Sequence, residues 1–538
     1  MRNAYVLTLI FIYQIIFSQQ SCINLIHLKS KYDNFVYSIK ETNSGYLITG
    51  SAKDSLYFNS NLVLYNNELY SFLIETDQNF NVINSIKFTL SLSTSTDYIN
   101  CVDVLKDNNY YYLLINWAGN LKLNSTTTIN GDKSMILVKV DNSNNVYWYY
   151  YMNNSVGTGI CFDNHKNITL IGNSPTQSGY NPSSVFMLNL DKSAGQIKKS
   201  KIGVSYFNAF TGKILFKNNQ YFFTCKYKDS LYFGNQKLYG TAYSEAIVVS
   251  DTNFNFQKYS TISALSPNNV NNINSIFIND FVLDNSNNII LTGKYLPISL
   301  YVNDTIRLSK SNSYIEQMFI LKLNPSLNFL WAKQENQNTS NNPNYNMRSG
   351  FKVSTNSNDD IFVLSYFNTT ITLGNMDTYN GTSLILVKYN SNGQYLLSEK
   401  VAGMTLASYY TLHTNNNSIV LSANFIGTVS VCQNTITATP NKNTYIAVMD
   451  KLTEIFSNEK LLQKINIFPN PANSEIYISN DNLFESLKYN IYDLTGKIIL
   501  NGTVENNTLH VNDLSNGVYL LKLSSNSQSE FFKVTIIH

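Results

Sequence analysis

The chain has 538 residues. A typical single domain has roughly 150, so we expect more than one folding unit or one large closed architecture. Its 38 Lys and Arg nearly balance its 35 Asp and Glu, and charged residues make up only 14% of the sequence. This composition excludes a basic nucleic-acid-binding protein and an acidic tail protein. Hydrophobic residues (43%) and aromatic residues (13%) supply a large core and exclude a wholly disordered chain.

The N-terminus has the layout of a secretory signal peptide. Arg2 precedes a largely apolar run, Ala4–Phe17, and small and polar residues follow at 18–21. The run is shorter than the roughly 20 apolar residues that a membrane-spanning helix needs. We therefore predict a signal peptide over residues 1–19. Gln19 stands where a lipoprotein signal has an apolar residue three positions before its cysteine, so we expect no lipid anchor on Cys22.

The cysteines are scattered singly along the chain. They form no C-x-x-C pair, which argues against a zinc site or a redox motif. Disulfides are an alternative in an exported chain, but Cys225 and Cys432 lie in apolar, strand-like contexts that are typical of buried free thiols. We expect structural, unpaired cysteines at Cys101, Cys161, Cys225 and Cys432.

The body of the chain contains an internal repeat. An apolar run that ends in an acidic or amide residue recurs about every 62 residues, a spacing typical of propellers and repeat arrays. A second short apolar run precedes each copy, and the flanking Asn, Asp, Gly and Ser residues mark turns. The copies are Phe72–Asp77, Ile136–Asp141, Phe186–Asp191, Ile247–Asp251, Phe319–Asn324, Ile385–Asn390 and Tyr445–Asp450.

Each repeat offers four short strands, which is the content of one propeller blade. Asp284–Gly293 and Met318–Lys333 resemble the repeat of bacterial seven-bladed propellers most closely. We therefore predict an all-β fold with a seven-bladed β-propeller over residues 20–457. Such a ring must join its ends, because an open propeller exposes a strand edge. Two segments compete for the outer strand of the last blade, Ile23–Leu28 and Glu454–Leu461.

The sequence lacks the motifs of the common catalytic sites. Five scattered histidines supply no H-E-x-x-H, and there is no G-x-S-x-G elbow, P-loop or calcium loop. The repeated acidic residues, such as Asp77 and Asp141, end strands, where Asp caps turns through its own side chain. We predict no catalytic residue, no metal and no cofactor.

Two aromatic clusters stand out, Tyr110–Tyr112 and Tyr147–Tyr151. Strand alternation buries one face, while on an edge strand the other face would present Tyr and Trp to solvent. Such a face suits stacking on sugars or binding protein partners. Packing between blades is the alternative reading of the same residues.

The repeat stops after Lys464, and a separate module of short strands and polar turns follows at residues 466–538, behind a linker at 458–465. Turn residues separate its expected strands, which predicts a small Ig-like β-sandwich. These strands are Ile476–Ser479, Tyr489–Tyr492, Lys497–Leu500, Thr508–Val511, Val518–Leu523 and Phe531–Ile537.

An ordered set of turn residues runs through this module. Prolines stop strand pairing at its entrance, and glycines and an Asp are suited to its turns. The set resembles the type A C-terminal sorting domain of the bacterial type IX secretion system over the whole module. Its members are Pro469, Asn470, Pro471, Tyr492, Asp493, Gly496, Lys497, Leu514, Gly517, Tyr519 and Lys533.

The resemblance implies export through the type IX machinery of a Gram-negative bacterium, to the outer cell surface or the medium. We therefore expect a secreted or surface-displayed propeller that binds an extracellular glycan or protein without catalysis. No nucleic acid is expected as a partner. A propeller hydrolase or lyase with unrecognised carboxylates, and a purely structural surface component, are the alternatives.

Overall fold

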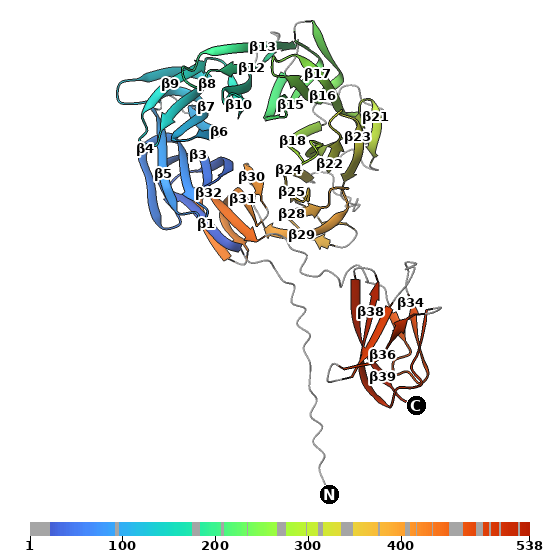
Figure 1. Cartoon of the computed structure of the whole chain (residues 1–538). Helices are drawn as coiled ribbons and strands as arrows, with labels where there is room; N and C mark the ends of the chain where they lie inside the picture. Colours follow the sequence, from blue (N-terminus) through green and yellow to red (C-terminus); the bar gives the residue numbers. More distant parts are fainter. Residues whose placement is uncertain are drawn as a thin grey trace. The chain divides into compact units, whose positions relative to one another are not determined.

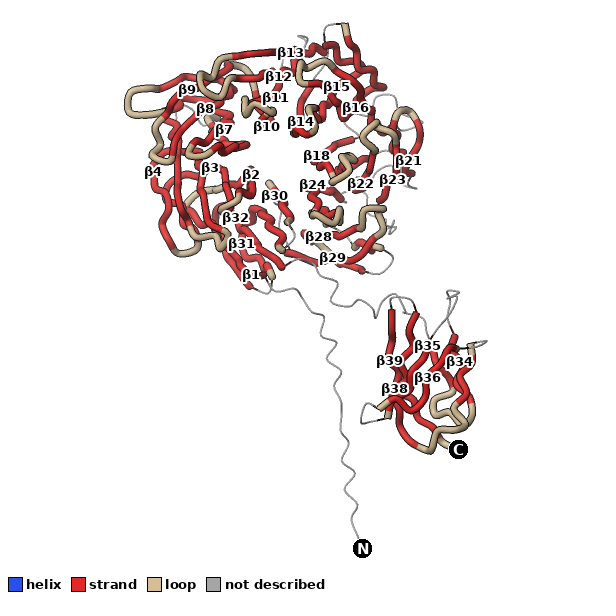
Figure 2. The backbone as a smooth tube through the Cα atoms, viewed as in Figure 1, coloured by secondary structure: helices blue, strands red, loops and turns tan. Residues whose placement is uncertain are grey.

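The computed structural model describes the chain from residue 22 onward, apart from several gaps. The described residues are 22–91, 96–174, 183–205, 209–233, 235–265, 276–296, 299–309, 316–334, 348–368, 370–374, 377–403, 409–415, 417–432, 434–450, 466–479, 488–493, 497–504, 507–525 and 528–538. The chain divides into two compact units, Met1–Leu452 and Thr453–His538. The described residues form strands and loops in both units (Figure 2).

The first unit is built from consecutive groups of four antiparallel strands arranged around an axis (Figure 1). The first four groups are β2 (Phe35–Thr42), β3 (Gly45–Phe58), β4 (Asn61–Asp77) and β5 (Val82–Ser91); β6 (Tyr98–Asp107), β7 (Tyr110–Lys122), β8 (Thr128–Asp141) and β9 (Val146–Met152); β10 (Val156–Phe162), β11 (Ile168–Ser174), β12 (Ser183–Leu190) and β13 (Ile197–Ser205); and β14 (Ala209–Lys217), β15 (Gln220–Phe233), β16 (Gln236–Asp251) and β17 (Phe256–Leu265).

The remaining groups follow the same plan, with the N-terminal strand added to the last one. They are β18 (Ile276–Leu283), β19 (Ile289–Tyr295), β22 (Gln317–Leu323) and β23 (Phe329–Gln334); β24 (Arg348–Thr355), β25 (Ile361–Phe367), β28 (Ser383–Tyr389) and β29 (Tyr395–Ala402); and β30 (Tyr410–Thr414), β31 (Ser418–Val431), β32 (Asn434–Asp450) and β1 (Cys22–Ser30). The all-β class and the propeller architecture are confirmed. Seven blades remain the predicted count for the closed ring.

The N-terminal strand closes the ring. β1 pairs with β32 in antiparallel register, with His27 opposite Tyr445. Of the two segments that compete for this place, Ile23–Leu28 therefore occupies it, and Glu454–Leu461 lies outside the described residues.

A disulfide reinforces this closure. It joins Cys22 to Cys432, with 5.4 Å between their Cα atoms. The prediction of an unpaired cysteine is wrong at Cys432, because only ring closure brings Cys22 of β1 beside the β31–β32 hairpin. Cys101, Cys161 and Cys225 are buried free thiols, as predicted.

Several turns between the second and third strands of a group extend outward as β-hairpins, which we call straps. In five groups the strap pairs with the outer strand of the preceding group, so that the N–H and C=O groups of that strand are hydrogen-bonded instead of left as an open edge. Between β25 and β28, the hairpin of β26 (Ile371–Leu373) and β27 (Asp377–Tyr379) forms a sheet of its own among the described residues. In one group the strap is a separate hairpin, β20 (Ser299–Val302) and β21 (Thr305–Ser309). The pairings include Leu28 with Phe58, Leu90 with Leu121, Val204 with Tyr232, Ile262 with Val302 and Ala402 with Val431.

Apolar side chains fill the seams between neighbouring groups, and a few buried polar links cross them. One cluster joins Leu47 of the first group to Leu113 of the second. In another seam, Asp280 Oδ2 accepts a hydrogen bond from the Val353 N–H at 3.2 Å, and Lys213 Nζ lies 3.1 Å from Asp280 Oδ1. Because Asp280 is buried, it fixes the inner strands of three consecutive groups to one another.

The second unit contains two small sheets that pack as a β-sandwich. One sheet contains β33 (Asn466–Phe468), β34 (Glu475–Ser479) and β37 (Thr508–His510). The other contains β36 (Ile498–Thr503), β35 (Lys488–Tyr492), β38 (Gly517–Ser525) and β39 (Gln528–Ile536). Ile476, Ile491, Leu521 and Val534 are among the buried residues between them. The predicted strands of this module are all present, and β33 is an additional one.

Candidate functional sites

The acidic residues that end the repeated strands are turn caps. Asp141 Oδ1 accepts hydrogen bonds from the backbone N–H groups of Ser143 and Asn145, each at 2.9 Å, and its Oδ2 accepts one from Asn145 Nδ2 at 3.0 Å. These hydrogen bonds from Asn145 hold the pKa of Asp141 below its ordinary value. Asp77 and Asp251 make the same three bonds in their own turns. The prediction of turn caps is confirmed at these positions.

The described residues include potential metal ligands and free thiols, two kinds of reactive group. No three His, Cys, Asp or Glu side chains among them gather as a metal site would require. Burial raises the pKa of the free thiols Cys101, Cys161 and Cys225, so these cysteines are protonated and unreactive at neutral pH. None of the described residues belongs to a helix that is long and apolar enough to cross a bilayer.

The outer strand β9 presents tyrosines to solvent. Trp148 is buried and donates a hydrogen bond from Nε1 to the Lys192 carbonyl at 3.1 Å, whereas Tyr149 and Tyr151 are 41% and 43% exposed. The rings of Tyr149 and Tyr151 have centroids 6.3 Å apart, and Tyr151 also packs edge-on against the buried Trp117. Within the described part of the chain β9 pairs with β8 alone. The aromatic cluster thus serves both of its predicted roles, packing between blades on one face and exposure on the other.

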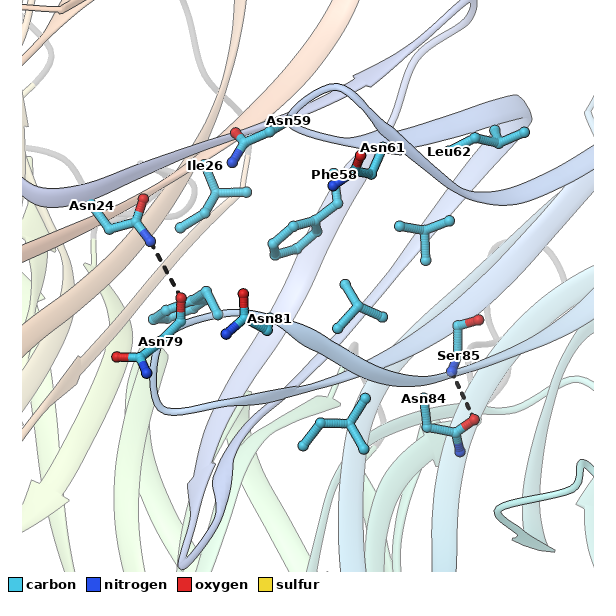
Figure 3. A pocket seen from close by; sticks show the side chains of 14 residues that line it. Asn24, Ile26, Phe58, Asn59, Asn61, Leu62, Asn79, Asn81, Asn84 and Ser85 are labelled. Carbon is cyan, nitrogen blue, oxygen red and sulfur yellow. Dashed lines mark hydrogen bonds between the residues drawn. The ribbon is translucent and has the colours of Figure 1, made fainter.

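A pocket of about 660 Å³ lies where β1 meets the first group of strands (Figure 3). Its walls come from β1, from the β3–β4 turn with the strand ends beside it, and from the β4–β5 turn with the start of β5. Sequence reasoning missed this site because its walls come from segments that only ring closure brings together. The lining residues are Asn24, Ile26, Phe58, Asn59, Asn61, Leu62, Val63, Asn79, Phe80, Asn81, Val82, Ile83, Asn84 and Ser85.

In the second unit, the first and last elements of the predicted sorting motif lie side by side. Asn470 Nδ2 donates a hydrogen bond to the Lys533 carbonyl at 2.8 Å, and Asn470 Oδ1 accepts one from the Thr535 N–H at 2.9 Å. Pro469 and Pro471 flank Asn470, and both are exposed. Asn470 therefore ties the entrance of the module to its last strand.

The middle of the motif forms a turn. The Asp493 N–H donates to the Lys497 carbonyl at 2.9 Å, and Asp493 Oδ1 accepts a hydrogen bond from the Lys497 N–H at 3.0 Å. Tyr492 lies at the end of β35 and accepts a hydrogen bond from Asn490 Nδ2 at 3.4 Å. Gly496 lies outside the described residues.

The last glycine of the motif, Gly517, does not adopt the turn conformation that the sequence suggested. Gly517 begins β38, its φ lies outside the left-handed region, and a Cβ built on it would meet Tyr519 at an ordinary 3.5 Å. The expectation that Gly517 admits a special turn conformation is wrong, because it pairs with Ile536 as an ordinary strand residue. Leu514 is buried, and the Tyr519 hydroxyl donates to the Ser515 carbonyl at 2.8 Å.

Sequence reasoning missed two hydrogen bonds that join the C-terminal residue, His538, to the loop before β38. The His538 N–H donates to Asn516 Oδ1 at 2.7 Å, and its imidazole Nε2 lies 2.6 Å from the Leu514 carbonyl, to which it donates. The Asn-Gly pair at 516–517 signals a turn, but nothing in the sequence links it to the last residue.

Comparisons with known proteins agree with this division of the chain. Residues 466–537 match the family model described as "Secretion system C-terminal sorting domain". No curated protein matches the chain.

Similar solved structures include PorZ, a bacterial surface component of the type IX secretion system of Porphyromonas gingivalis. It has 10% identity and a TM-score of 0.30, and the match covers 94% of this chain and 75% of that one. The Dos1 propeller has 8% identity and a TM-score of 0.39, with 78% and 95% covered. A periplasmic gluconolactonase of Pseudomonas aeruginosa has 10% identity and a TM-score of 0.27, with 63% and 99% covered.

The sorting-domain match coincides with the sandwich of the second unit and with the motif between Pro469 and Lys533. Such a domain implies interaction with the type IX machinery and marks its chain for export to the cell surface or the medium. Residues 466–537 are a C-terminal sorting domain of the type IX secretion system.

Proposed function

We propose that the exported chain is a non-catalytic binding protein whose propeller recognises an extracellular glycan or protein through its outer surface. The exposed pair Tyr149 and Tyr151 on β9 carries the proposal. A tyrosine ring offers a rigid apolar face with a polar tip, so it binds at a low cost in side-chain entropy. Two such rings with centroids 6.3 Å apart form a platform on which an elongated ligand can stack.

We also propose that the exposed and the buried residues of the sorting motif have different roles. Pro469, Asn470, Pro471 and Lys533 have exposed side chains and lie together on the module surface. Leu514 is buried, so its part is to hold the sandwich together. The secretion machinery would read the exposed group, and the signal peptide over residues 1–19 would deliver the chain to it.

Binding is tested with the chain from residue 20 onward, applied to a glycan array and used in pull-downs from bacterial surface extracts. Each ligand found is then titrated against Tyr149→Ala/Tyr151→Ala and against a control, Tyr239→Ala, which removes an exposed tyrosine from β16. We expect the double variant to lose about tenfold or more in affinity and the control to keep wild-type affinity.

Two results would contradict the proposal. Equal affinities of the double variant and the control would show that β9 is not the binding surface. Release of reducing ends or peptide fragments from a bound ligand would show that the protein is catalytic.

A further inference from the structure

We propose that the pocket between β1 and the first group of strands is a binding site for a neutral oligosaccharide. This inference deepens the proposed function and rests on it, since it names one ligand class and a second contact surface, separate from β9. The pocket volume of about 660 Å³ lies within the range of roughly 300–1,000 Å³ that is usual for small-molecule sites.

The chemistry of the lining selects the ligand class. Of the 14 lining residues, six are Asn, one is Ser, seven are apolar, and none is ionisable. A charged ligand would lose water there without gaining a counter-charge, which is costly. Sugar hydroxyls both donate and accept hydrogen bonds, and a side-chain amide offers both functions.

Several of these amides are available to a ligand. Asn59 uses Oδ1 to accept the His27 N–H at 2.9 Å, which leaves its Nδ2 as a donor. Among the described residues, the side chains of Asn61 and Asn79 make no hydrogen bond. Figure 3 shows Asn61 and Asn79 on opposite sides of the pocket, so a sugar bound there could be held from both walls.

The pocket also has apolar surface in contact with water. Leu62 is 55% exposed and Ile83 is 58% exposed, at the start of β4 and on β5 respectively. Exposed apolar side chains beside a polar hollow are a feature of binding sites. The C–H faces of a sugar ring would pack on them while its hydroxyls reach the amides. Asn is frequent throughout this chain, so amides alone do not indicate a binding site. The combination of Asn amides with exposed aliphatic side chains, and without charged ones, indicates this site.

The walls are fixed in advance of binding. The Asn59 N–H donates to the His27 carbonyl at 2.9 Å, so Asn59 and His27 form a two-bond link between the β3–β4 turn and β1. On the other side, Phe80 stacks on Tyr46 with centroids 4.5 Å apart and anchors the β4–β5 turn. A preformed site spends little of its binding energy on ordering its own walls.

The test is calorimetric titration of the chain from residue 20 onward with neutral hexasaccharides: malto-, cello-, xylo-, manno- and laminari-hexaose. Heparin serves as a polyanionic comparison. We expect at least one neutral oligosaccharide to bind and heparin not to bind at this pocket. Asn61→Ala/Asn79→Ala should weaken that affinity about tenfold or more, since each lost hydrogen bond has a modest net value.

The matched control is Asn253→Ala. Asn253 holds the same position after Asp251 that Asn79 holds after Asp77, but in a different group of strands. This control should keep wild-type affinity. Leu62→Ser, which exchanges an exposed apolar side chain for a small polar one, should weaken binding without changing the unfolding temperature.

Three results would overturn the pocket proposal. In the first, none of the neutral hexasaccharides binds. In the second, binding survives the Asn61/Asn79 and Leu62 variants and is lost in Tyr149→Ala/Tyr151→Ala, which leaves the proposed function intact and places the ligand on β9. In the third, the pocket variants abolish binding of a peptide and not of any sugar.

Discussion

The sulfur atoms of Cys22 and Cys432 are joined in a disulfide, although 410 residues separate the two cysteines. One is the first residue of β1, and the other lies in the turn between β31 and β32. The bond therefore locks the N-terminal strand onto the last group of the ring. It also leaves no free thiol at Cys22 for a lipid anchor.

Replacing both residues, Cys22→Ser and Cys432→Ser, should lower the thermal midpoint of the propeller and speed hydrogen exchange across β1. Loss of a native disulfide typically costs about 2–5 kcal/mol. Scanning calorimetry and exchange mass spectrometry measure the two effects. As a control, dithiothreitol should shift the wild-type midpoint and leave the double variant unchanged. An identical midpoint for both proteins would mean that β1 needs no covalent tie.

Acid should weaken ring closure through His27. Burial, reinforced by the nearby Lys29, lowers the pKa of His27 to about 4. Between about pH 6.5 and pH 4, His27 is therefore protonated in the unfolded chain and neutral in the folded chain. The free energy of unfolding falls as the pH falls through this window. His27 is partly exposed, and we expect an effect on the order of 1 kcal/mol between pH 7 and pH 5.

The check is to compare wild type with His27→Gln at both pH values. The variant should lose less in unfolding midpoint on acidification than the wild type does. Parallel pH profiles of the two proteins would exclude His27 as the responsible group.

Deletion of residues 466–538 should keep the propeller inside the cell envelope. The propeller and the sorting domain are separate compact units, so the truncated protein should still fold and should accumulate in the periplasm. Immunoblots of periplasm, cell surface and medium give the distribution. A reporter that carries a signal peptide and residues 466–538 should leave the cell. Wild-type levels of the truncated protein in the medium would refute the sorting role of this domain.

Within the sorting domain, Asn470→Ala should be more damaging than Gly517→Ala. The first removes two hydrogen bonds that tie the module entrance to the last strand, at a cost of about 1–3 kcal/mol. The second adds a methyl group where φ is ordinary and the nearest neighbour lies at contact distance. Export assays and thermal unfolding of the full chain test both, with the exposed Asn512→Ala as the control. An export defect in Gly517→Ala with unchanged stability would mean that the machinery contacts this position directly.

Local features of the fold could be predicted from the sequence because they depend on neighbours along the chain. The strand periodicity and the Asp141 turn cap are of this kind, since each involves residues within a few positions of one another. The disulfide, the straps and the pocket walls could not be predicted, because each joins segments that only the closed ring brings together. Gly517 shows a further limit: glycine permits a left-handed conformation and does not require it.

The straps make the order of synthesis matter. The straps that pair reach back to the outer strand of the group before them, so that strand keeps an open edge until the next group has been made. β1 is made at the start but finds its partner β32 only when residue 450 is available. Where a strap pairs, the growing propeller therefore exposes the outer edge of its newest group, and β1 lacks its partner β32 until residue 450 has been made. A chain interrupted anywhere before the last group would leave both open to pairing with a second copy.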